Sequence, residues 1–171
     1  MPYALLAPIY FTSGTITFTG DVDTGIFGST RGIMDIDMAN SSATTPRLTV
    51  EYGGNVSANT TINQNAELIS LTTNGAAAAT WTGLINSNGG DGEGTLNIQG
   101  TGGITFASAV GKAGSGSLLL VNIDQAATFD GAVEATNFTV DADSTFTGAV
   151  TANTAFTVAG ATTDVTVTAS S

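Results

Sequence analysis

The sequence contains no cysteine and no histidine. Without cysteine there is no disulfide framework and no thiolate ligand for a metal ion. Without histidine as well, a single chain cannot build a Ser–His–Asp or Cys–His catalytic site, or a histidine-based zinc or iron site. Most mechanisms of enzymatic hydrolysis are therefore excluded.

Positive charge is almost as scarce. Only Arg31, Arg47 and Lys112 face 14 acidic residues, so the formal net charge is −11. Such a surface repels phosphate backbones, and we expect no nucleic-acid partner. The apolar residues 1–11 contain Pro2 and Pro8, carry no Lys or Arg, and are too short for the roughly 20 residues of a membrane span. Neither a secretory signal nor membrane insertion is expected.

Residues that favour helices are also rare, with four Glu and three Gln in the chain, whereas Thr and Val alternate with small polar residues throughout. Because 42% of the residues are apolar, the chain can still bury a core. The pattern predicts an all-β protein. Strands are expected where apolar and polar residues alternate, at 14–18, 47–51, 95–98, 137–140, 155–158 and 164–168.

A six-residue pattern recurs along the chain: Thr, an aromatic residue, any residue, a small residue, any residue, then Val or Ile. It occurs as TFTGDV (17–22), TWTGLI (80–85), TFASAV (105–110), TFDGAV (128–133) and TFTGAV (145–150). Its aromatic members are Phe18, Trp81, Phe106, Phe129 and Phe146, of which the last four are 25, 23 and 17 residues apart. These intervals match one coil of a β-solenoid.

We therefore predict a β-solenoid, or β-helix-like, repeat module in which the five aromatic residues form an internal ladder or an assembly contact. Gly83, Gly131 and Gly148 follow the aromatic residues by two positions, where a tight bend requires a residue without Cβ. Because residues 21–60 break the period, we divide the chain into an N-terminal β subregion for assembly or attachment (1–60) and a solenoid repeat region (61–171). A single coiled chain and three intertwined chains both fit this pattern.

Carboxylates are the remaining candidates for chemistry. Pairs two residues apart lie on one face of a strand with side chains about 7 Å apart, a spacing that glycosidases can use. The pairs are Asp21/Asp23, Asp35/Asp37, Asp91/Glu93 and Asp141/Asp143. No cluster of aromatic residues near them suggests a sugar cleft, and a solvated acidic edge that blocks wrong strand pairing explains them better. We nominate no catalytic residue and expect no enzyme activity.

The loop GGDGEG at 89–94 is the one candidate metal site. Asp91 and Glu93 offer oxygen ligands on a glycine-rich turn, as calcium prefers. The loop matches neither an EF-hand nor a calcium-binding repeat, so a structural calcium ion and a plain exposed loop are the two alternatives. No other cofactor is expected.

Two segments resemble known families. FTGDVDTGIFGS (18–29), followed by TPRLTVEYGGNVSA (45–58), is similar to elements of bacteriophage tail-fibre and related virion surface proteins, and TFTGAVTANTAFTVAG (145–160) resembles their shaft repeats. The later segment is equally similar to repeats of filamentous-haemagglutinin-type β-helical adhesins. The first resemblance implies an elongated structural component of a virion surface, without catalysis. The second implies an extracellular adhesin or filament subunit of a microbial cell.

The first resemblance also implies partners. Proteins of that kind are usually trimeric, so we expect association with copies of this chain, as a trimer or a head-to-tail stack, and with other virion or surface proteins. The open ends of a solenoid support self-association on physical grounds, because unpaired N–H and C=O groups there require a cap or a partner. The chain lacks a recognisable receptor-binding tip and an autochaperone domain.

Overall fold

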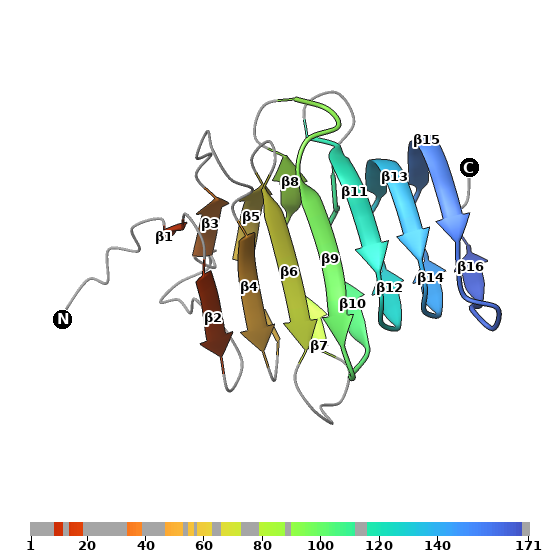
Figure 1. The fold of residues 1–171 in the computed structure, drawn as a ribbon, viewed down its shortest axis with the longest axis horizontal. Coiled ribbons are helices and arrows are strands. Elements are labelled where there is room, and N and C mark those ends of the chain that lie inside the picture. The colour runs from red at the N-terminus through yellow and green to blue at the C-terminus, as the bar shows by residue number, and fades with distance from the viewer. Residues whose placement is uncertain are drawn as a thin grey trace, which may run out of the picture.

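The computed structural model describes residues 9–11, 14–18, 34–38, 47–52, 55–56, 58–62, 66–72, 79–87, 90–111 and 116–168. Within these residues there is no helix, and the strands line up along one axis (Figure 1). All strand pairings are parallel. Parallel neighbours cannot be joined by tight hairpins, so the chain winds round the axis as a β-solenoid and confirms the predicted fold class.

Three sheets form the walls of the solenoid. The seven-stranded sheet contains β2 (Gly14–Phe18), β4 (Arg47–Tyr52), β6 (Glu67–Thr72), β9 (Thr95–Gly100), β11 (Leu118–Ile123), β13 (Val133–Val140) and β15 (Val150–Val158). The five-stranded sheet contains β7 (Ala79–Trp81), β10 (Ile104–Phe106), β12 (Ala127–Phe129), β14 (Ser144–Phe146) and β16 (Val165–Val167). The four-stranded sheet contains β1 (Ile9–Phe11), β3 (Met34–Met38), β5 (Ala58–Ile62) and β8 (Ile85–Ser87).

One turn of the chain visits the three sheets in order, and we call such a turn a rung. The strands β9 and β10 are followed by Val110, which bridges Ile85 of β8, before β11 returns to the seven-stranded sheet. Beyond Val110 the same wall continues through Val133 and Val150, the first residues of β13 and β15. The pairing of β13 with β15 is irregular between Ala135 and Asn137, where both strands pass from one wall into the next.

Inward and outward residues alternate along each wall. The strands β7, β10, β12 and β14 have three residues each. The first and third residues are buried, and the central Thr is half-buried. In the seven-stranded sheet, Leu68, Leu96, Val121 and Phe138 pair in register from strand to strand, and all four are buried. Parallel stacking therefore places apolar residues over apolar residues in one continuous core.

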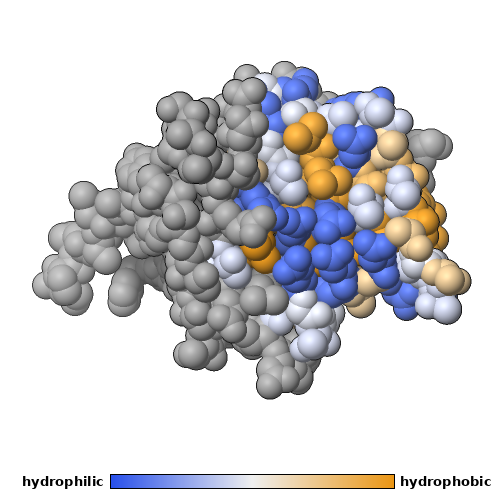
Figure 2. Space-filling model, in the orientation of Figure 1, coloured by the Kyte–Doolittle hydropathy of each residue, from blue (hydrophilic) through white to orange (hydrophobic). Residues whose placement is uncertain are grey.

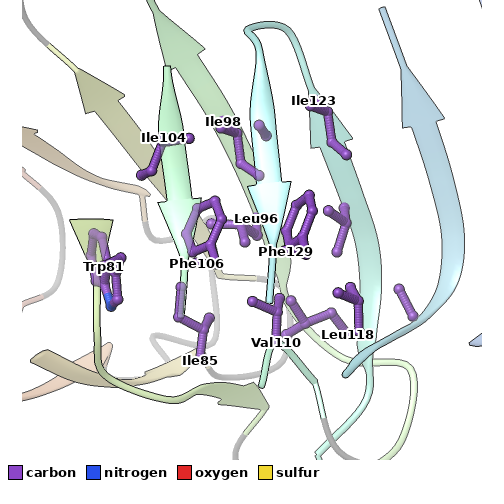
Figure 3. Close-up of a cluster of buried hydrophobic side chains, with 14 of the residues drawn as sticks. Trp81, Ile85, Leu96, Ile98, Ile104, Phe106, Val110, Leu118, Ile123 and Phe129 are labelled. Carbon is purple, nitrogen blue, oxygen red and sulfur yellow. The ribbon is translucent and has the colours of Figure 1, made fainter. Parts of the chain in front are cut away.

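The predicted aromatic ladder is present in the five-stranded sheet. Register pairs Trp81 with Phe106, Phe106 with Phe129 and Phe129 with Phe146. The Phe106–Phe129 and Phe129–Phe146 rings stack at 5.1 and 4.9 Å between centroids, while Trp81 lies tilted 6.4 Å from Phe106. Figure 3 shows the first three on successive strands, pointing into the core. All four side chains are buried, so they form the interior of the solenoid.

Phe18 does not belong to this column. It ends β2 in the seven-stranded sheet, where it pairs with Tyr52, whereas the residue bridged to Trp81 is Val56. The hexad at 17–22 therefore places its aromatic residue on a different wall from the other four, so Phe18 is not part of the internal ladder, and a role of Phe18 in assembly stays a prediction. The six-residue pattern specifies strand alternation but does not specify which wall the strand joins.

Two of the predicted glycine positions are sites of close contact between rungs. A Cβ on Gly131 would lie 2.4 Å from the carbonyl carbon of Ser108, and one on Gly148 would lie 2.2 Å from the carbonyl oxygen of Gly131. Each bend therefore rests on the bend of the rung before it. The missing side chain lets the backbone corners stack as closely as the strands between them.

The sheets cross the predicted boundary at residue 60. Strand β5 contains that residue, and β2 and β4 belong to the same seven-stranded sheet as β6 to β15. The described strands of residues 1–60 thus share their sheets with the repeat region. A role of this part in assembly or attachment stays a prediction, and the segment 20–29 that carries part of the tail-fibre resemblance lies outside the described residues.

The ladder predicts a large difference between neighbouring residues of β12. Phe129→Ala removes a ring that stacks on both sides, and we expect the free energy of unfolding to fall by about 3–5 kcal/mol. Thr128→Ala, which changes the outward-facing neighbour, should cost less than about 1 kcal/mol. Urea denaturation followed by circular dichroism checks this, and equal losses for the two variants would contradict an internal ladder.

The stacked corners predict an equally sharp contrast between glycines. Gly131→Ala forces a Cβ into the backbone of Ser108 and should destabilise the protein by about 1–3 kcal/mol. Gly116→Ala is the matched control, because its Cβ would come no closer than 3.4 Å to Asn86, an ordinary contact. Thermal unfolding of both variants is the measurement. A Gly131→Ala protein that melts with the control would show that the corners are not in contact.

Candidate functional site: the C-terminal end of the solenoid

The rung formed by residues 150–168, which we call the terminal rung, contains β15 and β16 and the turn between them. Its strands lie at one end of the seven-stranded and five-stranded sheets, so each has a hydrogen-bonded neighbour on one side only among the described strands. In Figure 1 this end is at the right. The free sides of β15 and β16 present backbone N–H and C=O groups with no strand to accept them.

Apolar residues that would be core in any other rung are exposed here. Phe156 pairs with the buried Phe138 yet is 37% exposed, and Val158 pairs with the buried Val140 yet is 46% exposed. Val167 follows Phe146 in the column of the aromatic ladder and is 57% exposed. Apolar surface is visible at this end of the molecule in Figure 2.

Phe156 is exposed because it lies in the last described rung, and not because its side chain points outward. The ring of Phe156 stacks on Phe138 at 5.2 Å and meets Phe146 edge-on at 5.9 Å, so it points into the solenoid like its partners. Its outer side is open because no described rung covers it. Covering the partly exposed side chains of Phe156, Val158 and Val167 would contribute about 1 kcal/mol each, roughly half the value for burying such residues completely.

Charge is nearly absent from both ends of the chain. Of the 17 charged residues, residues 1–20 contain none and residues 144–171 contain only Asp164. The strands β1, β2, β15 and β16 therefore lack the charged side chains that commonly protect exposed sheet edges from pairing with other chains. The formal charge of −11 belongs almost wholly to the residues between these ends.

The outer face of the five-stranded sheet carries a second feature, a shallow depression of about 250 Å³. Thr105, Thr128, Thr145 and Thr166 line it in register, and Asp143 and Asp164 are also among its lining residues. No lining residue is aromatic. The Oδ1 atom of Asp143 accepts a hydrogen bond of 2.9 Å from the backbone N–H of Asp164, so this carboxylate orients the following rung.

The structure describes the carboxylate pairs of the sequence only in part. Asp141 and Asp143 are both exposed at a corner. Only the backbone of Asp35 and Asp37 is described, in β3, and Asp21 and Asp23 lie outside the described residues. Across the part of the chain that the structure describes, no three carboxylates converge as a metal site would require.

Asp91 of the candidate calcium loop has a structural role. Its Oδ1 atom accepts hydrogen bonds from the backbone N–H groups of Gly116 and Ser117, at 3.1 and 3.2 Å, and so holds the corresponding loop of the next rung. Asn55 and Asn59 act in the same way on Thr80 and Leu84, and in these three cases the bonded residues are 25 apart. Glu93 is half-buried near Gly90. Calcium binding at this loop stays a prediction.

A buried polar contact was not predicted. The hydroxyl of Thr72 donates a hydrogen bond of 2.6 Å to Oε1 of Gln125, although the two residues are 53 positions apart. Gly100, between them in the stack, has φ of 130°, and a Cβ there would lie within 2.6 Å of both side chains. Nothing in the sequence around Gln125, which follows Asp124 directly, could identify the partner.

The contacts of Asp91 yield a test that separates its two possible roles. Asp91→Ala removes both bonds to the loop and should lower the free energy of unfolding by about 1–2 kcal/mol, whereas Asp91→Asn keeps an oxygen acceptor and should lose less than half of that. Thermal melts without added metal measure both. The structural role would be wrong if both variants melted at the temperature of the wild type without metal, and if added calcium stabilised the wild type but neither variant. The carboxylate would then be a metal ligand.

No helix in the described residues is long and apolar enough to cross a membrane. Comparisons with protein-family models, curated proteins and solved structures found no match to this chain. Function must therefore be argued from the contacts above and from the resemblances of the sequence.

Proposed function

We propose that this chain is a structural protein that associates with copies of itself and contributes shape and stability without catalysis. The observation that carries the proposal is the uncovered terminal rung, in which core-type side chains and unpaired strand edges coincide. The described residues of one chain leave both exposed, and soluble proteins normally cover such surfaces with a cap or a partner.

The place of this protein is proposed to be a virion surface, as part of a fibre or as a decoration of the capsid, next to other virion proteins. The support comes from the GDVDTGIF and RLTVEYGGNV elements at 20–27 and 47–56, which resemble bacteriophage tail-fibre and related virion proteins. The elongated solenoid agrees with a fibre segment. A trimer, usual in that group, is one form that the self-association could take.

A second candidate is a filament or adhesin subunit of a microbial cell. The specific observation in its favour is that the segment 145–160, whose resemblance to haemagglutinin-type repeats is as close as that to fibre shafts, stacks in register on the repeat before it. Both candidates share a solenoid that self-associates and differ in the particle that carries it. Electron microscopy of the native particle, with antibodies against the chain, distinguishes a virion from a cell surface.

The shared element, self-association, has a direct test. We expect sedimentation velocity and native mass spectrometry of the full chain to show oligomers at micromolar concentration, with a larger oligomeric fraction at 0.5 M than at 0.05 M salt, because salt screens repulsion between chains of net charge −11. A protein that stays monomeric at every concentration and salt level would refute the proposed function.

A further inference from the structure

We infer that the terminal rung binds the opposite end of a second copy of this chain, formed by β1 and β2, so that the solenoid continues head to tail from one molecule into the next. This inference rests on the proposed self-association and specifies the surface that mediates it.

The strand edges at the two ends of the seven-stranded sheet are complementary. Every sheet is parallel, so the free edge of β15 presents the same pattern of donors and acceptors that β13 presents to β15. The strand β2 lies at the other end of the same sheet, and the edge on which no described strand pairs with it carries the matching half of that pattern. Translation of one molecule along the axis therefore brings two complementary edges together. Such a contact is heterologous and does not close into a ring, so further copies can add to it.

Columns of residues in register run through the seven-stranded sheet from β2 to β15. Gly14 stands at the start of the column that runs through Leu48, Leu68, Leu96, Val121 and Phe138 to Phe156. Ile16 stands in the neighbouring column, which ends at Val158. If this register continues across the joint, the exposed ring of Phe156 meets the one β2 position that lacks a side chain, and Val158 meets an isoleucine.

The distribution of charge favours contact between the ends over contact between the sides. Side-by-side contacts would bring together residues 21–143, which contain all but one of the 14 acidic residues and only three basic ones. End-to-end contacts join β1 and β2, which contain no charged residue, to β15 and β16, which contain none either. In a chain of net charge −11 the two ends are thus the surfaces that another copy can approach with least repulsion.

The first experiment compares glutamates introduced on two neighbouring strands. Val158→Glu places a charge in the exposed core column of the edge strand β15, and Thr139→Glu adds the same charge at a half-buried, outward-facing position of β13, one strand away from the joint. We expect the wild type and Thr139→Glu to form an open series of oligomers that lengthens with concentration. Val158→Glu should weaken this association at least tenfold while melting as a monomer within a few degrees of the control.

The second experiment uses the absence of native cysteine. Thr15 and Thr157 would be neighbours across the joint, about 4.8 Å apart at Cα, which is within the range of a disulfide. Within one molecule they are separated by the width of seven strands, roughly 29 Å, so they cannot pair. The double variant Thr15→Cys/Thr157→Cys should give a ladder of covalent multimers on mild oxidation, and Thr15→Cys/Thr128→Cys should give none.

The outcomes separate this inference from the function on which it rests. A closed trimer that survives Val158→Glu and gives no covalent ladder would overturn the head-to-tail contact and leave self-association intact. A monomer under all conditions would overturn both. Concentration-dependent multimers that require an uncharged residue 158 and cross-link between positions 15 and 157 support the inference.

Discussion

Parallel stacking of rungs in register is the constraint on which the rest of this structure depends. Neighbouring strands lie about 4.8 Å apart, and each inward residue rests on the equivalent residue of the rung before it. The interior is therefore a set of columns, and a column is stable only if its members are compatible in size and polarity. The stacked Phe106, Phe129 and Phe146 satisfy this condition with rings, and Gly131 and Gly148 satisfy it at the corners with the absence of a side chain.

The same constraint explains why several polar side chains hold one rung to the next. Asn55, Asn59 and Asp91 each accept a backbone N–H from a residue 25 positions later, so their side chains set the spacing of one rung against the next. Carboxylates that in isolation suggest metal binding or catalysis thus include some that hold the backbone in place. Stacking in register also explains why the solenoid ends in unpaired strand edges, since the hydrogen bonds of each rung are completed by the rung that follows.

The regularity of the hexads was enough to predict the solenoid, the column from Trp81 to Phe146 and the close corners. What the residues could not reveal was which wall each strand would join, so the hexads alone do not show that Phe18 lies outside the ladder or that Val56 bridges Trp81. The candidate assembly surface was equally inaccessible. The sequence FTV occurs at 138–140 and again at 156–158, and only the presence of a rung above the first makes it core and leaves the second exposed.

In this account the terminal rung is a rung like the others that lacks its neighbour, and its stability should depend on whether another chain supplies one. Hydrogen exchange measured by mass spectrometry across a range of protein concentrations tests this most directly. The account predicts fast exchange in β15 and β16 at high dilution and protection approaching that of β11 and β12 as concentration rises, with the central strands unchanged throughout. Protection of β15 and β16 that is already high at dilution and independent of concentration would contradict it.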